Sequence, residues 1–297
     1  MLHYYSRFVE QYNKNYETSA FFTKYNTFVS NLNNIIAHNA KPNASYTMAV
    51  NEFADMTFEE FSSKLGLKPI KASYARSLNT AKFSRKISNG AKDWRADGAV
   101  NKMKNQGQCG SCWAFSANAA IEGSVQISTG KLLDLAESQL VDCAGDFGNY
   151  GCNGGLMDSA FEYVLSNGGI CATSEYPYKA VDGTCKQCKN VASISGYKNV
   201  KENDEADLTS AIDQTVVAVA VEANSNFQFY SSGVFNGPCG TALNHGIAAV
   251  GYDLNVAKPY YIVRNSWGTS WGEGGYIRMA TGENLCGIAA MASYVQA

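Results

Sequence analysis

The sequence predicts an α+β fold whose body has a helical half and a β half with a cleft between them, preceded by a separate helical segment. Three observations carry this prediction. All nine cysteines follow residue 108, so the first third of the chain differs from the rest. Helical periodicity dominates residues 112 to 166, and strand-like runs separated by Gly and Asn dominate the sequence after residue 191. With 297 residues and 45% hydrophobic content, the chain can form one large domain or two smaller units.

The front segment predicts one long amphipathic helix and one short capped helix. Thr57 and Glu60 form a capping box, and we expect Gly66 to end the helix that follows it. Residues 67–91 show no clear period and predict an extended linker that a protease could reach. The apolar side of the long helix is formed by Phe21, Tyr25, Phe28, Leu32, Ile35 and Ile36.

The body begins with helices and continues with strands. A buried helix is predicted from Cys112 to about Ser128, ending near Gly130. Shorter helical runs cover residues 134–142 and 157–166. Strands are predicted at residues 216–221, 246–252, 260–263 and 275–279.

Charge is unevenly distributed along the chain. Residues 1–87 carry eleven Lys and Arg against six Asp and Glu, a net charge of +5, whereas residues 88–297 have a net charge of −7. Because no dense basic run is present, we expect no nucleic-acid partner, and we expect the two parts to dock on each other. No run approaches the ~18 apolar residues that span a bilayer, so no membrane partner is expected. The first residues lack the apolar core of a signal peptide, so any targeting segment is expected to have been removed or never included.

The cysteines leave several interpretations open. An odd number suggests four disulfides and one free thiol in an oxidising compartment, or metal sites and buried thiols in the cytosol. Cys109 and Cys112 form a Cys-x-x-Cys unit, which fits a zinc pair or a redox disulfide. Cys112 also stands where a glycine-rich turn meets a helix, and the positive end of a helix favours a nucleophilic thiolate.

Two further residues could complete a catalytic group. Only three histidines are present; His3 and His38 lie in the front segment, where exposure or packing explains them. His245 stands at the start of an apolar strand and could reach across a cleft, although a structural role is the better interpretation when it is taken alone. Asn265 ends another apolar strand and could orient His245, with Trp267 keeping water from that contact.

Together these motifs resemble those of the papain-like cysteine peptidases, in the cathepsin-L-like branch. The signature is Cys-Gly-Ser-Cys-Trp at residues 109–113, followed by His245 and Asn265 at 133 and 153 residues after Cys112. The resemblance covers essentially the whole chain. It implies the papain-like fold of two subdomains, with a helical left half, a β-barrel-like right half and an active-site cleft between them.

The resemblance also implies roles for individual residues. Cys112 would attack the peptide carbonyl as a thiolate paired with the imidazolium of His245. Asn265 would hold the histidine ring, and Trp267 would shield that contact. Gln106 would donate its side-chain amide to the oxyanion, together with the N–H of Cys112. No cofactor and no metal are implied.

Disulfides follow from the same resemblance, which pairs Cys109 with Cys152, Cys143 with Cys185 and Cys239 with Cys286. Cys171 and Cys188 have no counterpart in the common family pattern, and we expect them to form a fourth bridge. Cys112 then remains free, and a zinc site built from the two Cys-x-x-Cys units is disfavoured.

The resemblance places a substrate cleft beside Gly154 and Gly155, which let an extended peptide bond to the backbone. No long insertion follows Gly155, so we expect an endopeptidase. The S2 pocket would contain no carboxylate, and Met291 would make it shallow, which predicts Leu, Val or Ile rather than Phe or Arg at P2. Its implied lining is Met157, Ala220 (or Val219, one residue away), Leu243, Gly246 and Met291.

Residues 1–87 resemble the inhibitory propeptide of this family, and residues 88–297 resemble the catalytic domain, with maturation expected near Ser88. The resemblance implies a latent proenzyme activated by acid, as carboxylates protonate and the two parts attract each other less. One propeptide motif is Ala20, Lys24, Phe28, Asn31, Ile35 and Asn39, and the other is Ala49, Asn51, Phe53 and Asp55; Ala20 and Ala49 depart from the family's Glu and Gly.

As partners, the resemblance implies protein and peptide substrates, the chain's own propeptide and cystatin-like inhibitors. We expect the enzyme to be a monomer. We expect it to be located in the lysosome, in a vacuole or outside the cell. Two alternatives remain. A catalytically inert binding or structural protein of the same fold usually lacks the nucleophile, which Cys112 supplies here. An acyltransferase such as a transglutaminase uses a similar Cys-His pair but does not share the propeptide and disulfide pattern. Asn43 is a glycosylation acceptor by pattern alone.

Overall fold

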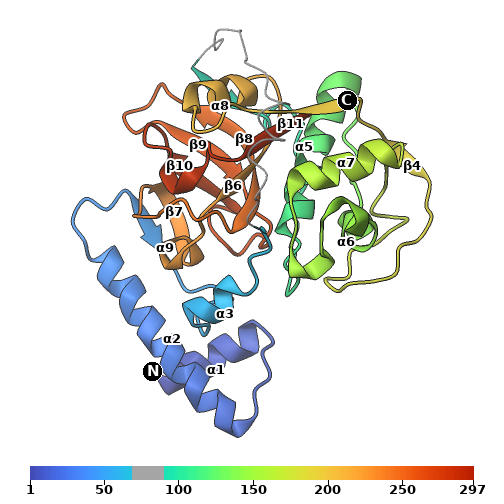
Figure 1. Ribbon diagram of the computed structural model, residues 1–297. Coiled ribbons are helices and arrows are strands. Elements are labelled where there is room, and N and C mark those ends of the chain that lie inside the picture. The colour runs from blue at the N-terminus through green and yellow to red at the C-terminus, as the bar shows by residue number, and fades with distance from the viewer. Residues whose placement is uncertain (69–89) are drawn as a thin grey trace.

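The computed structural model describes residues 1–68 and 90–297. Figure 1 shows a small helical body, formed by the start of the chain, below a larger body that has a half rich in strands and a half rich in helices. Most of the expected linker, residues 69–89, and the expected maturation point at Ser88 lie outside the described residues.

The helices group by body. The front segment contains α1 (Leu2–Gln11), α2 (Thr18–Asn39) and α3 (Phe58–Ser62); the helical half contains α5 (Cys112–Thr129), α6 (Glu137–Cys143) and α7 (Met157–Ser166); and the β half contains α8 (Glu205–Ile212) and α9 (Ser225–Gln228). Short 3₁₀ turns lie at Gly145–Phe147, Gly151–Asn153 and Leu285–Gly287.

One large sheet forms the β half, and its edge is extended by a strand of the front segment. The strand order is β1-β7-β10-β9-β8-β6-β11-β5, with β2 also paired to β8. Its members are β1 (Tyr46–Met48), β2 (Ala91–Asp93), β5 (Gly196–Asn199), β6 (Val217–Val221), β7 (Tyr230–Phe235), β8 (His245–Asp253), β9 (Tyr260–Arg264), β10 (Tyr276–Ala280) and β11 (Ala292–Gln296). A separate pair joins β3 (Ile170–Cys171) to β4 (Asn190–Ala192).

Several predicted elements are confirmed. Helix α5 begins at Cys112 and ends at Gly130, which adopts the left-handed conformation expected of a terminating glycine. The capping box of Thr57 and Glu60 is formed in both directions. The prediction that Gly66 ends this helix is wrong, because α3 already ends at Ser62 and the chain then extends toward the body.

The two largest apolar clusters among the described residues lie one in each half of the body. One fills the β half and continues into the front segment, where it includes Phe28 and Phe61. The other fills the helical half, packs around α5 and includes Leu67 of the front segment. The front segment therefore contributes side chains to both halves of the body. In the described ranges, no helix combines the length and apolar composition needed to cross a bilayer.

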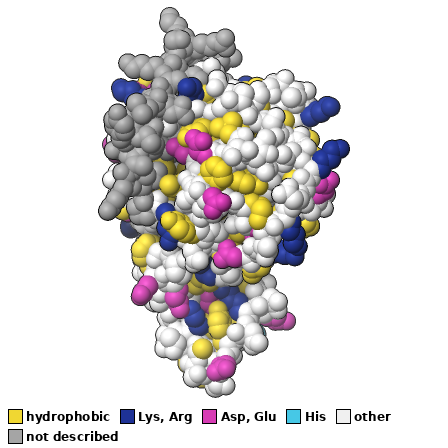
Figure 2. All heavy atoms as spheres, turned by 45° about the vertical axis from the view of Figure 1, so that its right-hand side comes forward, with side chains coloured by type: hydrophobic (Ala, Val, Ile, Leu, Met, Phe, Trp, Pro, Cys, Tyr) yellow, Lys and Arg dark blue, Asp and Glu magenta, His cyan; other side chains and the backbone are white. Residues whose placement is uncertain are grey.

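The positive net charge of residues 1–87 is not spread evenly over that segment. Residues 1–68 carry six Lys and Arg and six Asp and Glu, so all five surplus positive charges belong to residues 69–87. Figure 2 shows basic and acidic side chains scattered over the drawn face, with no single patch of either sign. The described part of the front segment is therefore docked without a net charge of its own.

Candidate active site

The glycine-rich turn before α5 holds Cys112 at the boundary between the two halves. The disulfide of Cys109 with Cys152 and the hydrogen bond from Gly110 N to Cys152 O, at 3.0 Å, anchor this turn. Cys112 is the first residue of α5, is completely buried and forms no disulfide. The backbone N–H of Gly246, on the facing strand, donates to its sulfur at 3.3 Å.

His245 and Asn265 come together because β8 and β9 are antiparallel neighbours and the start of one lies beside the end of the other. The Nε2 atom of His245 lies 2.8 Å from Asn265 Oδ1. Because an amide oxygen only accepts, Nε2 carries the hydrogen and the lone pair of the neutral ring is on Nδ1, which has no partner among the described residues. Trp267 stacks on the ring, with centroids 4.7 Å apart.

Burial governs the protonation of this pair. Burial raises the pKa of the Cys112 thiol to about 11, against the opposing effect of backbone N–H groups from Gly246 and Gly66. Burial also lowers the pKa of His245 to about 4, although the contact with Asn265 favours the charged ring. The structure therefore holds a neutral thiol and a neutral imidazole, whereas the expected working state is an ion pair.

Gln106 is fixed on the same turn by contacts at both ends of its side chain. Its Oε1 atom accepts a hydrogen bond from Ser266 Oγ at 2.7 Å, and its backbone N–H donates to Ser266 O at 2.8 Å. Its Nε2 atom donates to Cys109 O at 3.0 Å. The bond to the Ser266 hydroxyl decides which end of the amide is the donor end, and that donor end lies on the turn that carries Cys112.

A segment of the front body occupies the space above Cys112. Gly155 N donates to Gly66 O at 2.8 Å, and Lys68 N donates to Gly155 O at 3.2 Å, so the segment pairs with the glycine wall in parallel. A Cβ placed on Gly66 would stand 1.7 Å from Gly110 O. Only glycine allows the chain to pass this close to the nucleophile turn. Gly66 is thus a point of close approach to the turn, which the sequence did not reveal.

The side chain after Gly66 belongs to the same apolar cluster as most residues expected to line the S2 pocket. Leu67 is buried in a cluster that includes Met157, Ala220 and Met291, with Leu243 packed at its edge. Strand β6 alternates its sides, so Ala220 belongs to this cluster and Val219 belongs to the other core. Ala220 is therefore the one of the two candidates that shares a cluster with Leu67.

Gly246 also borders this pocket: a Cβ on Gly246 would stand 3.1 Å from the Met157 sulfur.

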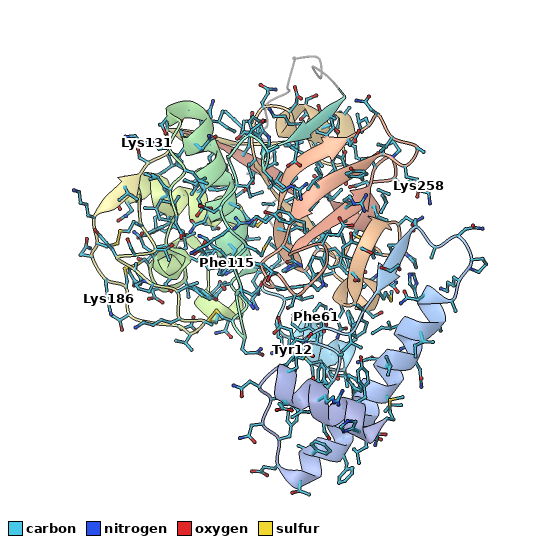
Figure 3. All side chains as sticks on the ribbon, turned by 180° about the vertical axis from the view of Figure 1, so that it is seen from behind. Tyr12, Phe61, Phe115, Lys131, Lys186 and Lys258 are labelled. Atoms are coloured by element: carbon cyan, nitrogen blue, oxygen red, sulfur yellow. A yellow bond between two sulfur atoms is a disulfide. The ribbon has the colours of Figure 1, made fainter. Side chains whose placement is uncertain are left out.

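Aromatic side chains attach the front segment to the tryptophan that covers His245. Phe53 and Phe61 meet Trp267 edge-on, with ring centroids at 5.2 and 5.3 Å. Figure 3 labels Phe61 where the small body meets the large one. Asn51 Nδ2 donates to Gln228 O at 2.7 Å, and Gln228 Nε2 donates to Phe53 O at 3.1 Å. No motif in the sequence marked Gln228 for this role.

The first propeptide motif holds the front body together. Asn31 Nδ2 donates to the carbonyls of residues 54 and 56, each at 2.9 Å, and Asn39 exchanges two hydrogen bonds with Met48. Ala20 cannot form an ion pair, and Lys24 instead pairs with Glu60 on α3 at 2.6 Å.

The second propeptide motif ends in a buried carboxylate. Asp55 is fully buried and is contacted by Lys14 Nζ at 2.9 Å and by the hydroxyl of Tyr16 at 2.7 Å. Lys14 also donates to Glu52 O at 2.7 Å. This cluster ties the turn that precedes α3 to the loop between α1 and α2.

All nine cysteines lie in the described part, and the bonds are the three pairs that the resemblance implies and the fourth bridge that we expected. The bonds join Cys109 to Cys152, Cys143 to Cys185, Cys171 to Cys188 and Cys239 to Cys286. Within residues 1–68 and 90–297, no group of three or more acidic, His or Cys side chains is arranged to hold a metal ion.

The chain matches two family models and many known proteins. Residues 89–296 match the papain family cysteine protease, and residues 5–61 match the cathepsin propeptide inhibitor domain. Oryzain beta chain of Oryza sativa is 47% identical over 90% of this chain, and vignain of Ricinus communis is 48% identical over 91% of this chain and 79% of its own length. A probable cysteine protease of Arabidopsis thaliana is 49% identical over 91% of this chain. This chain spans 60% of the length of that protease and 60% of the length of oryzain beta chain.

Solved structures give the same result. Digestive procathepsin L 3 from the larval midgut of Tenebrio molitor has a TM-score of 0.91 and 37% identity, with 100% of this chain and 99% of that chain covered. The recombinant stem bromelain precursor has a TM-score of 0.87 and 40% identity, with 99% and 98% covered. The chain therefore belongs to the papain family of cysteine proteases and carries the propeptide inhibitor domain found in cathepsins.

Proposed function

We propose that this chain is the proenzyme of a cysteine endopeptidase that cleaves peptide bonds through an acyl-enzyme on Cys112. The observation that carries the proposal is the convergence of four residues below a backbone-paired segment. Cys112, Gln106 and the His245–Asn265 pair come from three separate parts of the chain, and the segment above them lies in the cleft as an extended peptide.

In the working enzyme the Cys112 thiolate attacks the scissile carbonyl carbon, and the carbonyl oxygen becomes an oxyanion. Gln106 Nε2 and the N–H of Cys112 donate to that oxygen. His245 gives its proton to the departing amine, which leaves the acyl group on sulfur. The neutral ring then takes a proton from water as the water oxygen attacks the thioester carbon. The C–S bond breaks, the acid leaves, and Cys112 is again a thiolate beside the imidazolium of His245. Asn265 keeps the ring oriented throughout.

We assign the substrate preference to the pocket that Leu67 fills. Its lining is apolar, and an apolar side chain of the same shape as Leu67 gains burial there. The pocket residues include no carboxylate that could pair with Arg. The proposal is therefore preference for Leu, Val or Ile at P2, and endopeptidase action on protein and peptide substrates.

Latency follows from the covering segment. We propose residues 1–87 as the propeptide and residues 88–297 as the catalytic domain, with acid releasing the one from the other. Burial raises the pKa of Glu60, but its hydrogen bonds with Lys24 and Thr57 outweigh burial and lower it overall. A lowered pKa in the folded state means that the stabilising contribution of Glu60 is present above about pH 4.3 and is lost as the pH falls through the folded value.

Four disulfides favour an oxidising compartment, so we propose a secretory route ending in a lysosome, in a vacuole or outside the cell. We further propose that the mature enzyme acts as a monomer and is inhibited by cystatin-like proteins that fill the cleft.

The test is hydrolysis of fluorogenic peptides that differ only at P2, after acid treatment of the full chain. The expected result is hydrolysis fastest with Leu, Val or Ile, loss of activity in Cys112→Ser, and labelling of Cys112 by a peptidyl epoxide. Fastest hydrolysis with Arg at P2 would contradict the specificity. Absence of both hydrolysis and labelling would instead favour an inert protein of this fold, and transfer of acyl groups to amines in preference to water would favour an acyltransferase.

A further inference from the structure

Tyr178 lies in the loop between β3 and β4, far along the chain from the nucleophile turn, yet its hydroxyl touches both ends of that turn. The hydroxyl donates to the backbone carbonyl of Gln106 at 2.7 Å. It also lies 2.6 Å from Ser111 Oγ. Because the single hydroxyl hydrogen of Tyr178 is used on the carbonyl, Ser111 is the donor of the second bond.

The hydrogen bond with Tyr178 takes the place of the helix-capping bond that a serine at the position of Ser111 usually forms. Ser111 is the N-cap residue of α5, where a serine side chain usually accepts a hydrogen bond from the first turn of the helix. Here the side chain caps no helix N–H and is directed to Tyr178. The first turn of α5, which supplies the N–H of Cys112, is therefore left free of a side-chain cap.

The loop of Tyr178 also passes close to Gly107 of the turn and contacts two residues beside the turn, Cys152 and Phe115. The Cβ of Ala180 lies 3.2 Å from the position that a Cβ on Gly107 would take, and Ala180 itself has a φ of 57°, which is strained for a residue other than glycine. Asp182 Oδ1 accepts from the N–H of Cys152, the disulfide partner of Cys109, at 2.6 Å. The ring of Tyr178 packs edge-on against Phe115 of α5, with centroids 4.8 Å apart.

Burial raises the pKa of Tyr178 to about 12, so its hydroxyl stays protonated and remains a donor over the range in which the enzyme works. The Gln106 carbonyl that it binds belongs to the same residue as the proposed oxyanion donor. The other proposed donor, the N–H of Cys112, directly follows Ser111. One hydroxyl thus links the backbone positions of both donors.

We propose that Tyr178 is a positioning residue that fixes the spacing of the two oxyanion donors, Gln106 and the N–H of Cys112. It touches neither substrate nor the reacting atoms. Tyr178 therefore stabilises the transition state, in which the two donors form hydrogen bonds with the developing oxyanion. It does not change the affinity for the substrate in its ground state. This inference rests on the proposed peptidase function.

The test compares Tyr178→Phe with Tyr176→Phe in the acid-matured full chain. Tyr176 is the matched control because it lies in the same loop and its buried hydroxyl donates to Asp142 at 2.8 Å, but that hydroxyl bonds no residue of the nucleophile turn. We expect Tyr178→Phe to lower kcat about tenfold with KM within about twofold, because it removes both part-buried hydrogen bonds of the Tyr178 hydroxyl and these bonds act on the transition state. Tyr176→Phe keeps kcat within about twofold.

A second readout is the affinity for a peptide aldehyde, whose adduct with Cys112 places an oxyanion at the same donors. Tyr178→Phe weakens aldehyde binding about as much as it lowers kcat. Unchanged kcat and aldehyde affinity in Tyr178→Phe, or equal losses in both tyrosine variants, would overturn the inference.

If Tyr178→Phe does not mature, Ser111→Ala decides the question, since it removes one of the two bonds and leaves the Tyr178 ring in place. A partial loss of kcat supports the positioning role, and an unchanged kcat overturns it. Failure of the unsubstituted chain to hydrolyse peptides or label Cys112 would instead remove the proposed function itself.

Discussion

At the residue scale, Cys112 is subject to two opposing effects. Its position at the start of α5 favours the thiolate, typically by a few tenths to 1 kcal/mol in exposed helices. Complete burial below the propeptide has the larger effect and raises the thiol pKa to about 11. At neutral pH this pKa favours the thiol form of the covered sulfur, and we propose that the same residue becomes reactive once water and substrate reach it.

This state predicts how fast Cys112 is alkylated. In the intact proenzyme at pH 7, the thiolate fraction set by a pKa of about 11 is roughly 10⁻⁴, so iodoacetamide reacts slowly and its rate rises with pH up to that value. After maturation, the rate at pH 5 to 7 rises by orders of magnitude, because His245 can then stabilise the thiolate. Mass spectrometry of Cys112 measures both rates, and equal rates before and after maturation would contradict the account.

Gln106 carries the second prediction at this scale. Removing one oxyanion donor by Gln106→Ala lowers kcat by about 10²- to 10³-fold and changes KM little, because the lost bond forms only in the transition state. Gln108→Ala, two residues away and exposed, is the control and keeps its activity. Steady-state kinetics of the two matured variants decide the assignment, and a KM effect without a kcat effect would argue against it.

At the element scale, we propose that the segment from Gly66 to Lys68 is the part of the propeptide that blocks the active site. It is paired with the backbone of Gly155, and its Leu67 side chain fills an apolar pocket. The aromatic contact of Phe61 with Trp267 places α3 beside the catalytic histidine. The inhibition therefore combines strand pairing with the burial of apolar side chains.

Gly66→Ala tests this arrangement. The added Cβ would overlap Gly110 O, so the strand must lift, and hydrolysis of peptide by the unprocessed chain at neutral pH is expected to rise at least tenfold. Ser63→Ala, three residues earlier and exposed, is expected to stay latent. Initial rates measured before any cleavage report the result, and equal latency in both variants would argue against close passage of the strand.

Asp55 gives a second prediction for the front body. Asp55→Asn leaves Lys14 without its ion pair in a mostly buried position, and breaking a buried pair typically costs about 3 to 5 kcal/mol. The substituted proenzyme should therefore unfold its front body and mature at a higher pH than the original chain. The exposed Glu59→Gln serves as control, and the pH of half-maximal maturation is the measurement; the same pH in both variants would contradict it.

The long periodic elements and the local motifs could be predicted from the sequence, whereas contacts between distant segments could not. Helix α5, the capping box of α3 and the positions of His245 and Asn265 follow from periodicity, spacing and family resemblance. Helix α1 was missed because it is only ten residues long and precedes the clear pattern. Gly66 does not end a helix as predicted, because one sequence cannot distinguish a glycine that ends a helix from a glycine that lets two backbone segments pass close together.

At the scale of the whole molecule, net charge does not explain how the described propeptide docks. Its residues 1–68 are balanced in charge, and their contacts to the body are aromatic, apolar and hydrogen-bonded. The surplus positive charge belongs to residues 69–87, outside the described part. The docking of residues 1–68 therefore rests on contacts other than net-charge attraction, and we propose that such attraction contributes less to latency than these contacts do.

A salt titration separates the two contributions. In about 1 M NaCl the screening length is about 3 Å, which removes most attraction between exposed charges but leaves apolar burial intact. The proenzyme at pH 7 should remain latent in this salt and should lose latency on acidification at low salt. Rates with a fluorogenic peptide measure both, and release by salt alone would restore the electrostatic explanation.

The central claim is that the catalytic group is complete but covered in this chain. The most direct measurement is labelling of Cys112 by a peptidyl epoxide, followed by mass spectrometry, with the intact chain at pH 7 and with the same chain after acid maturation. The account predicts little labelling of the intact chain and complete labelling of the mature form. Equally fast labelling of both forms, with residues 1–87 still attached in the first, would contradict it.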